Sequence, residues 1–173
     1  GKDASDTTQQ ERDELKHMHY EKLNEIYTEY SKLSRAHILG DINAKIGRRS
    51  TQKEHHIVGP FTFYEQNALY IAQQSAGVQT NRALLINFCK VNDMRLTSTF
   101  FEKSDHELAT YTIPKDTLKL AALAVKEDRP VYPRELYDQI DFVLSPHRWE
   151  NHILDCYTDT NANIKANHFP III

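Results

Sequence analysis

This chain of 173 residues has only two cysteines, five glycines and no long apolar run. Two cysteines cannot build a disulfide framework, and Cys89 lies in the apolar run 84–89, where a buried reduced thiol is expected. No segment approaches the length of a membrane span, and the first residues form no apolar signal region. We therefore expect no membrane association and an intracellular location, nuclear or cytoplasmic.

The sequence also lacks an excess of positive charge. Its 21 basic and 24 acidic residues give a formal net charge of -3. A protein that binds nucleic acid through its overall charge would be basic. Any contact with nucleic acid must therefore come from a local basic patch, or from a metal ion that bridges acidic groups to phosphate.

The chain is rich enough in apolar residues, at 40%, to build the core of one domain over residues 1–173. Thr8 and Glu11 have the spacing of a capping box, which predicts the start of a helix. Apolar residues then recur at three- and four-residue steps, a pattern typical of an amphipathic helix packed on a sheet or, less readily, on a coiled-coil partner. This predicted stripe consists of Leu15, His19, Leu23, Ile26, Tyr30 and Leu33.

Strand patterns alternate with helices and long loops in the rest of the chain. We predict strands over 36–40, 94–101, 109–113, 139–144 and 168–173, a helix over 81–91, a loop over 43–67 and a further helical stretch at 118–125. The regular alternation of a doubly wound fold and a glycine-rich phosphate loop are both missing. We therefore predict a partial layered α/β sandwich, with a mixed, mostly antiparallel sheet flanked by helices.

Three of the predicted strands carry polar residues at their ends, in the segments 40–44, 139–142 and 166–169. Strand ends are where a layered fold brings distant side chains together. On an extended backbone, Asp41 and Asn43 would point to the same side. The sequence therefore predicts a site that combines Asp41, Asn43, Asp141 and His168.

These segments resemble signatures of the endonuclease/exonuclease/phosphatase superfamily, most closely the endonuclease domains of non-LTR retrotransposons. Residues 38–47 are similar to the Gly-Asp-Phe-Asn-Ala signature, residues 139–143 to the Gln-Ile-Asp-Tyr strand, and Asn167-His168 to the Ser-Asp-His ending. The resemblance covers about residues 9–173. It implies that this chain is the C-terminal portion of such a fold.

The resemblance also implies a role for each residue. Asp41 would orient or deprotonate the attacking water, Asn43 would bind a phosphate oxygen, and His168 would donate to the scissile phosphate while Asp141 holds its ring. Mg²⁺, held by Asp41 and Asn167, would neutralise phosphate charge. Each residue taken alone has an ordinary explanation as a cap, a strand-end charge or a packing residue, but their shared order favours an inherited site.

Two departures from the family pattern predict impaired catalysis. Asn167 replaces an aspartate, and an amide brings no charge to a metal. The family's N-terminal half, with the glutamate that anchors the metal, has no counterpart here. We therefore expect Mg²⁺ to bind weakly or not at all, and we expect uncovered sheet surface that would favour a homo-oligomer or a partner chain.

Lys45, Arg48, Arg49 and Lys53 form a basic cluster after the first strand. The cluster would contact a DNA backbone, or it is simply a solvated loop. Tyr111 would stack on a base, or lie in the core as strand aromatics usually do. The nine histidines lack the partners and spacing of zinc motifs, so we expect them at the surface or in packing.

The leading interpretation is a Mg²⁺-dependent, phosphodiester-cleaving endonuclease-like domain of retrotransposon origin, directed at DNA, truncated and catalytically impaired. The alternative is a non-catalytic interaction or structural protein derived from such a domain. A third interpretation, a phosphatase acting on a small phosphorylated molecule or lipid, follows from the breadth of the superfamily.

Overall fold

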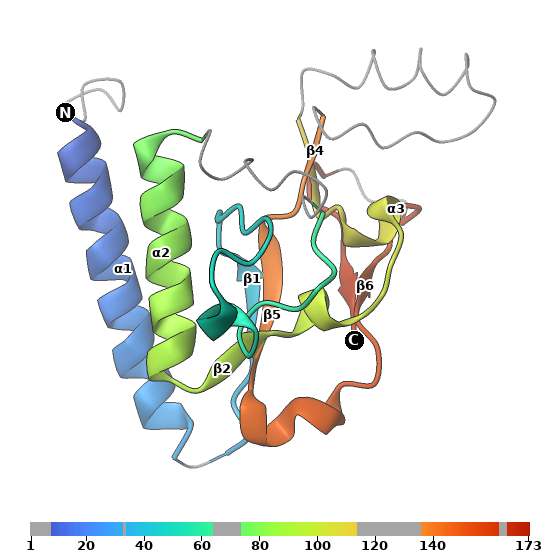
Figure 1. Ribbon diagram of the computed structural model, residues 1–173, viewed down its shortest axis with the longest axis horizontal. Coiled ribbons are helices and arrows are strands. Elements are labelled where there is room, and N and C mark those ends of the chain that lie inside the picture. Colours follow the sequence, from blue (N-terminus) through green and yellow to red (C-terminus); the bar gives the residue numbers. More distant parts are fainter. Residues whose placement is uncertain (1–7, 33, 64–73, 114–135, 163–165) are drawn as a thin grey trace.

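A computed structural model describes residues 8–32, 34–63, 74–113, 136–162 and 166–173 (Figure 1). The predicted helical stretch at 118–125 lies outside these residues. The helices are α1 (Gln9–Tyr30), α2 (Ala76–Val91) and α3 (Asp105–Leu108), with 3₁₀ segments at Gln52–Glu54, Thr97–Phe100 and His147–His152. The strands are β1 (Ile38–Asp41), β2 (Met94–Leu96), β3 (Tyr111–Thr112), β4 (Tyr137–Asp138), β5 (Asp141–Pro146), β6 (Tyr157–Thr158) and β7 (Ile171–Ile172).

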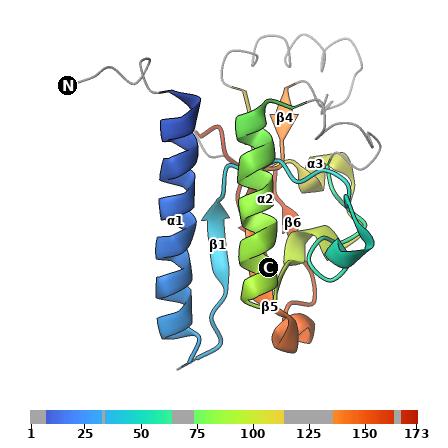
Figure 2. The same cartoon turned by 60° about the vertical axis from the view of Figure 1, so that its left-hand side comes forward.

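The strands form three small antiparallel sheets, and the predicted α/β class is confirmed. The largest sheet has the order β1-β5-β2, and the pairs β3-β4 and β6-β7 make the other two. Every residue of β5 after Asp141 is buried, as expected for the central strand of a covered sheet. The helices α1 and α2 lie side by side against this sheet (Figures 1 and 2).

Helix α1 begins with the predicted capping box. The Thr8 hydroxyl accepts from the Glu11 N–H at 3.2 Å, and the Glu11 carboxylate accepts from the Thr8 N–H at 2.7 Å. The predicted buried stripe is largely wrong, because Leu15, Ile26 and Tyr30 are exposed to 60%, 43% and 58%.

The buried side of α1 is set instead by two tyrosines. The rings of Tyr20 and Tyr27 pack on Phe88 of α2, with centroid distances of 6.1 and 6.2 Å. Aromatic rings bury more area than the aliphatic residues of the stripe, so they determine which face of α1 meets α2. Leu23 is the member of the predicted stripe that packs against this core.

Other predicted boundaries also differ from the structure. Helix α2 begins at Ala76, before the predicted start at residue 81. The strand predicted over 94–101 ends at Leu96, because the Thr99 hydroxyl donates to the Leu96 carbonyl at 2.6 Å and supports a 3₁₀ turn. The predicted terminal strand is regular only in β7, and β5 continues through Pro146, which pairs with Met94.

Two cores hold these elements together. The larger lies between the helices and the main sheet and includes Leu85, Phe88, Leu96, Phe142 and Leu144. The smaller lies under β3 and β4. None of the helices in the described ranges has the length and apolarity that a membrane crossing requires.

Candidate functional site

Asp41 and Asp141 face each other in the last residue pair at one end of the β1–β5 pairing. They are opposed residues of the antiparallel pair, and the Ile42 N–H donates to the Ile140 carbonyl at 3.1 Å just beyond them. Directly opposed residues place their side chains on the same face of a sheet. The two carboxylates, far apart in the sequence, are therefore neighbours.

His168 joins this pair from the C-terminal segment. Its Nδ1 lies 3.0 Å from Oδ2 and 3.2 Å from Oδ1 of Asp141. The backbone of His168 bridges to Tyr111, and the two rings lie 4.9 Å apart. Because Nδ1 is engaged by the carboxylate, Nε2 is the ring nitrogen left to exchange a proton with a ligand. The His168 side chain is 41% exposed, so a ligand can reach it.

Thr110 fixes the backbone that carries Asp141. The buried Thr110 hydroxyl accepts from the backbone N–H groups of Ile140 and Asp141, at 2.9 and 3.0 Å. The Thr110 carbonyl also accepts from Phe169 N–H at 2.8 Å, next to His168. One residue therefore ties both members of the Asp141–His168 pair to the same point of the chain.

Asn43 is close to Asp41, but not in the predicted way. It has a left-handed backbone, with φ of 50°, and its N–H donates to Asp41 Oδ1 at 2.7 Å. The prediction that Asp41 and Asn43 share one side of an extended strand is wrong, because β1 ends at Asp41 and a side-chain turn follows.

Asn81 of α2 holds this turn in place. Its side-chain amide donates to the carbonyls of Asn43 and Ile42, at 2.6 and 3.2 Å. Its oxygen accepts from the Tyr20 hydroxyl at 3.2 Å. Burial raises the pKa of the Tyr20 phenol, which keeps it a neutral donor. The two helices thereby anchor the backbone beside the candidate site.

Arg82, the next residue of α2, organises the loop that follows. Its guanidinium donates to the Ile46 carbonyl at 2.8 Å and to the Glu54 carboxylate at 2.7 Å. Glu54 also accepts from the Ser50 N–H at 2.8 Å. Both charged groups are buried, and each satisfies the other, as a buried ion pair requires.

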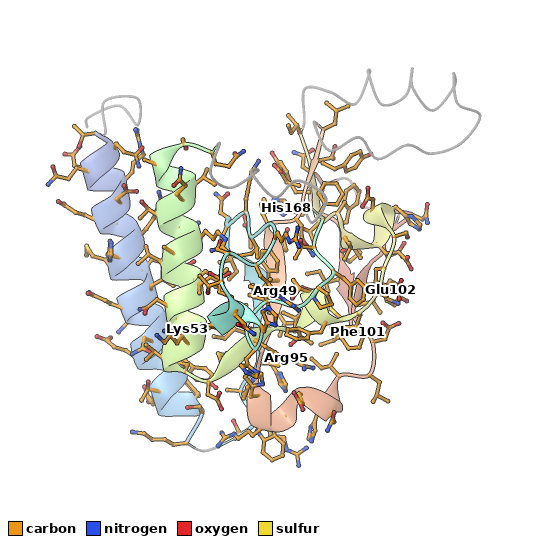
Figure 3. The ribbon with its side chains drawn as sticks, in the orientation of Figure 1. Arg49, Lys53, Arg95, Phe101, Glu102 and His168 are labelled. Carbon is orange, nitrogen blue, oxygen red and sulfur yellow. The ribbon has the colours of Figure 1, made fainter. Side chains whose placement is uncertain are left out.

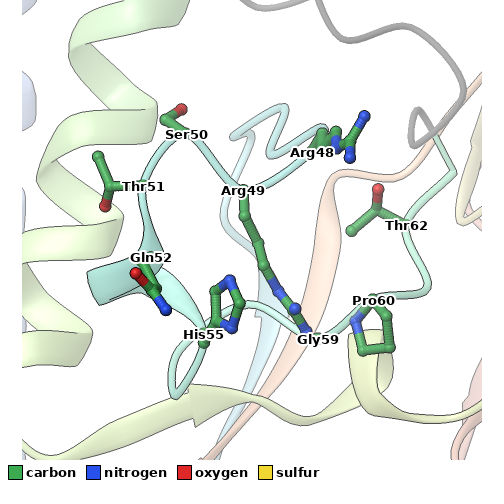
Figure 4. A pocket seen from close by; sticks show the side chains of 9 residues that line it. All are labelled: Arg48, Arg49, Ser50, Thr51, Gln52, His55, Gly59, Pro60 and Thr62. Atoms are coloured by element: carbon green, nitrogen blue, oxygen red, sulfur yellow. The ribbon is translucent and has the colours of Figure 1, made fainter.

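The predicted basic residues are placed differently from one another. Lys45 forms an ion pair with Asp138 at 2.8 Å. Burial raises the pKa of Asp138, and Lys45 opposes that rise. Arg48 and Arg49 instead line a pocket of about 490 Å³ (Figure 4). Lys53 lies on the same loop but outside the pocket lining (Figure 3).

The residues predicted to hold Mg²⁺ offer a sparse donor set. Asp41 has one carboxylate oxygen bound by the Asn43 N–H, and Asn167 is exposed beside His168. Across the described ranges, no three His, Cys, Asp or Glu side chains gather as a metal site would need. Oxygen donors suit Mg²⁺, but a single carboxylate leaves most of its coordination to water and substrate phosphate.

The chain is similar to Craniofacial development protein 2. The protein of that name from Bos taurus is 27% identical over 149 residues, which cover 86% of this chain and 20% of that protein. The protein of that name from Tragulus javanicus is 26% identical over 149 residues, which again cover 86% of this chain and 20% of that protein. No protein-family model matches the chain. The chain thus spans about a fifth of the length of the curated relatives it matches.

The similarity to Craniofacial development protein 2 does not single out the supporting residues, and neither did the sequence motifs. Thr110, Asn81 and Arg82 carry no motif of their own. Asn81 and Arg82 are nevertheless polar residues inside a helix whose other buried residues are apolar. A buried polar residue on such a face needs hydrogen-bond partners. Polar residues at these helix positions were therefore the sequence signal that could have identified Asn81 and Arg82 as supporting residues.

Proposed function

We propose that this chain is an endonuclease-like domain of the endonuclease/exonuclease/phosphatase type, of non-LTR retrotransposon origin, that binds the phosphodiester backbone of DNA. The observation that carries the proposal is the contact between Asp141 and His168 beside the opposed carboxylate of Asp41. An imidazole held by one carboxylate, next to a second carboxylate, is a set of groups that can act on a phosphodiester.

In hydrolysis, Asp41 would accept a proton from water as the water oxygen forms its bond to phosphorus. The bond from phosphorus to the leaving oxygen breaks, and that oxygen takes a proton from solvent. His168 would donate a hydrogen bond to a non-bridging oxygen, Asp141 would fix its ring, and Asn43 would donate an amide hydrogen to the phosphate. Mg²⁺, held by Asp41 and Asn167, would supply charge neutralisation.

The same donor set argues for weak catalysis. Asn167 contributes no charge, and of the two opposed carboxylates Asp141 is engaged by His168, which leaves Asp41 as the charged ligand. A metal held by one carboxylate binds weakly. We propose that cleavage is slow or absent, while the phosphate-binding geometry remains.

Nicking of supercoiled plasmid in the presence of Mg²⁺ tests this function. Asp41→Ala and His168→Ala would abolish any nicking, whereas Glu29→Ala and His17→Ala, exposed residues of α1, would leave it unchanged. Asn167→Asp would increase nicking by restoring a charged metal ligand. Nicking that survives both Asp41→Ala and His168→Ala would contradict the assignment of the site.

A second candidate function is a non-catalytic interaction domain, and the edge of the main sheet favours it. Strand β1 ends the order β1-β5-β2 among the described residues, and its Leu39 is 53% exposed. An exposed strand edge with an apolar side chain can pair with another chain. Sedimentation velocity would show a homo-oligomer that Leu39→Lys dissociates, and a monomer at all concentrations would count against self-association.

A further inference from the structure

A pocket lies on the loop that follows Asn43 in the sequence, and two short stretches of that loop form it. One wall comes from residues 48–52 and 55, the other from Gly59, Pro60 and Thr62 (Figure 4). A Cβ added at Gly59 would lie 1.9 Å from the Thr99 carbonyl oxygen, so only glycine allows the second wall to approach the 3₁₀ segment Thr97–Phe100. At Gly59 the second wall is therefore packed closely against this segment.

The lining of this pocket is basic and polar. It contains the guanidinium groups of Arg48 and Arg49 and no Asp or Glu among the described residues. The acidic residue of the same loop, Glu54, is neutralised by Arg82. In the described part of the chain Arg48 has no side-chain partner, and it is exposed. The lining therefore carries positive charge that no carboxylate of the described lining residues offsets.

Arg49 is held ready for a ligand. Its Nε donates to the Val58 carbonyl at 2.6 Å, which fixes the plane of the guanidinium and leaves its terminal nitrogens as donors. In Figure 4 the side chain runs from the first wall toward Gly59, with His55 beside it. A prearranged guanidinium loses less side-chain entropy when it binds a phosphate.

A buried hydroxyl in the lining is left without a partner. Thr62 is 4% exposed, and within the described ranges its Oγ1 makes no hydrogen bond. An unmade hydrogen bond at a buried hydroxyl is costly, and native proteins satisfy the great majority of such groups. This hydroxyl has no exposed surface, so it does not contact a ligand in the pocket, and the two arginines are the charged groups that offer donors there.

Hydrogen bonds connect the walls of the pocket to the backbone segments that carry the candidate site. The Phe63 N–H, next to Thr62, donates to the Gln139 side chain at 3.2 Å, and Gln139 is two residues from Asp141. On the other wall, Arg82 donates to the Arg48 carbonyl at 3.3 Å, while its neighbour Asn81 holds Asn43. The walls are therefore tied to the same two backbone segments that carry the candidate site.

We propose that this pocket binds a second phosphate of the nucleic-acid strand whose other phosphate lies at the Asp41–Asp141–His168 site. The inference rests on the proposed function for that first phosphate. A domain with two phosphate-binding sites binds a polymer with repeated phosphates more tightly than a molecule that bears a single phosphate. The substrate class is thus a nucleic-acid strand, and the pocket contributes its affinity through the backbone without reading sequence.

Fluorescence anisotropy with a labelled DNA duplex, in EDTA so that no cleavage occurs, tests the proposal. The double variant Arg48→Ala/Arg49→Ala should weaken binding, and the slope of log affinity against log salt should fall by roughly one per lost phosphate contact. Thr62→Val keeps the side-chain shape and removes a hydroxyl that has no exposed surface, so it should bind as the wild type does. Lys53→Ala is the matched control, on the same loop but outside the pocket, and should bind as the wild type does.

The outcomes separate this proposal from the proposed function. If the arginine variant binds DNA as well as Lys53→Ala does, the pocket proposal is overturned. If inorganic phosphate or an inositol phosphate displaces the duplex as readily as unlabelled duplex does, the ligand is a free phosphate compound and the polymer assignment is overturned. Binding that depends on Arg48 and Arg49 but is unchanged in His168→Ala supports the pocket, while the phosphate site of the proposed function fails. Circular dichroism melts of each variant show whether it is folded.

Discussion

The imidazole of His168 lies 3.0 Å from the carboxylate of Asp141, although the two residues belong to different parts of the sheet structure. Asp141 begins β5 in the main sheet, and His168 bridges to Tyr111 of the β3-β4 sheet. The contact therefore depends on how the two sheets are joined. Thr110, which binds the backbone of both segments, is the most direct link between them.

Replacing Thr110 with valine keeps the shape of the side chain and removes the acceptor of two backbone N–H groups, one buried and one partly buried. We expect a loss of about 1–3 kcal/mol in the free energy of unfolding, because those groups would be left unsatisfied. Urea denaturation measures the loss. Thr110→Ser retains the hydroxyl and should recover most of the stability, and a valine variant as stable as the serine variant would show that the hydroxyl is unimportant.

Asn81→Leu should destabilise the turn that contains Asn43. The substitution removes both donors to the carbonyls of Ile42 and Asn43 and leaves the Tyr20 hydroxyl unpaired. We expect a cost of about 1–3 kcal/mol for buried groups that lose their partners. Amide hydrogen exchange should show faster exchange of the Asn43 N–H, which is bonded to Asp41. Unchanged exchange at Asn43 would mean that Asn81 does not position the turn.

The ion pair between Arg82 and Glu54 offers a double-mutant cycle. Arg82→Met or Glu54→Gln alone leaves a buried charge without its partner, and each should cost about 3–5 kcal/mol. The double variant should cost less than the sum of the two, because neither charge then remains buried alone. Additive losses in urea denaturation would indicate that the two side chains do not act as a pair.

The two thiols should make the protein less stable at alkaline pH. Burial raises the pKa of Cys156 to about 12, and it also raises the pKa of Cys89. Below pH 9, the ordinary thiol pKa, both states keep the proton and stability is unaffected. Above it the unfolded state releases protons that the folded state keeps, so stability falls by up to about 1.4 kcal/mol per pH unit for each thiol.

Thiol reactivity checks the same prediction. In native protein at mildly alkaline pH both thiols should react slowly with a disulfide reagent, and both should react quickly in denaturant. The double variant Cys89→Ala/Cys156→Ala should lose the thiol-dependent part of the alkaline destabilisation. Rapid labelling of one native thiol would show that it is not buried as described.

The sequence predicted the parts of the fold that local rules determine. The Thr8–Glu11 capping box is confirmed, and the helix it starts follows at Gln9. The buried face of α1 was wrong, because the partner helix and not the spacing of aliphatic residues decides which face is covered. The end of β2 was wrong for a different reason, since the hydroxyl of Thr99 makes a local bond to the Leu96 carbonyl that the alternating pattern does not reveal.

Part of the candidate site was also predictable from the sequence, and part was not. Order along the chain predicted that Asp41, Asp141 and His168 belong together, and the structure brings them together. The turn at Asn43 rests on the local bond from its N–H to Asp41, which the assumption of an extended backbone missed. The pairing of Lys45 with Asp138 could not be predicted, because the partner lies far away in the sequence. The roles of these residues remain predictions, and they depend on phosphate reaching this group.

Nuclear magnetic resonance titration of the labelled protein with a non-hydrolysable DNA duplex and Mg²⁺ tests directly whether these residues bind a phosphodiester. The test does not require that the protein cleaves DNA. Backbone amide shifts should concentrate at Asp41, Asn43, Asp141 and His168, with a second group around Arg48 and Arg49. Shifts spread over other surfaces, or none at saturating duplex, would contradict the claim that these residues form a phosphodiester-binding site.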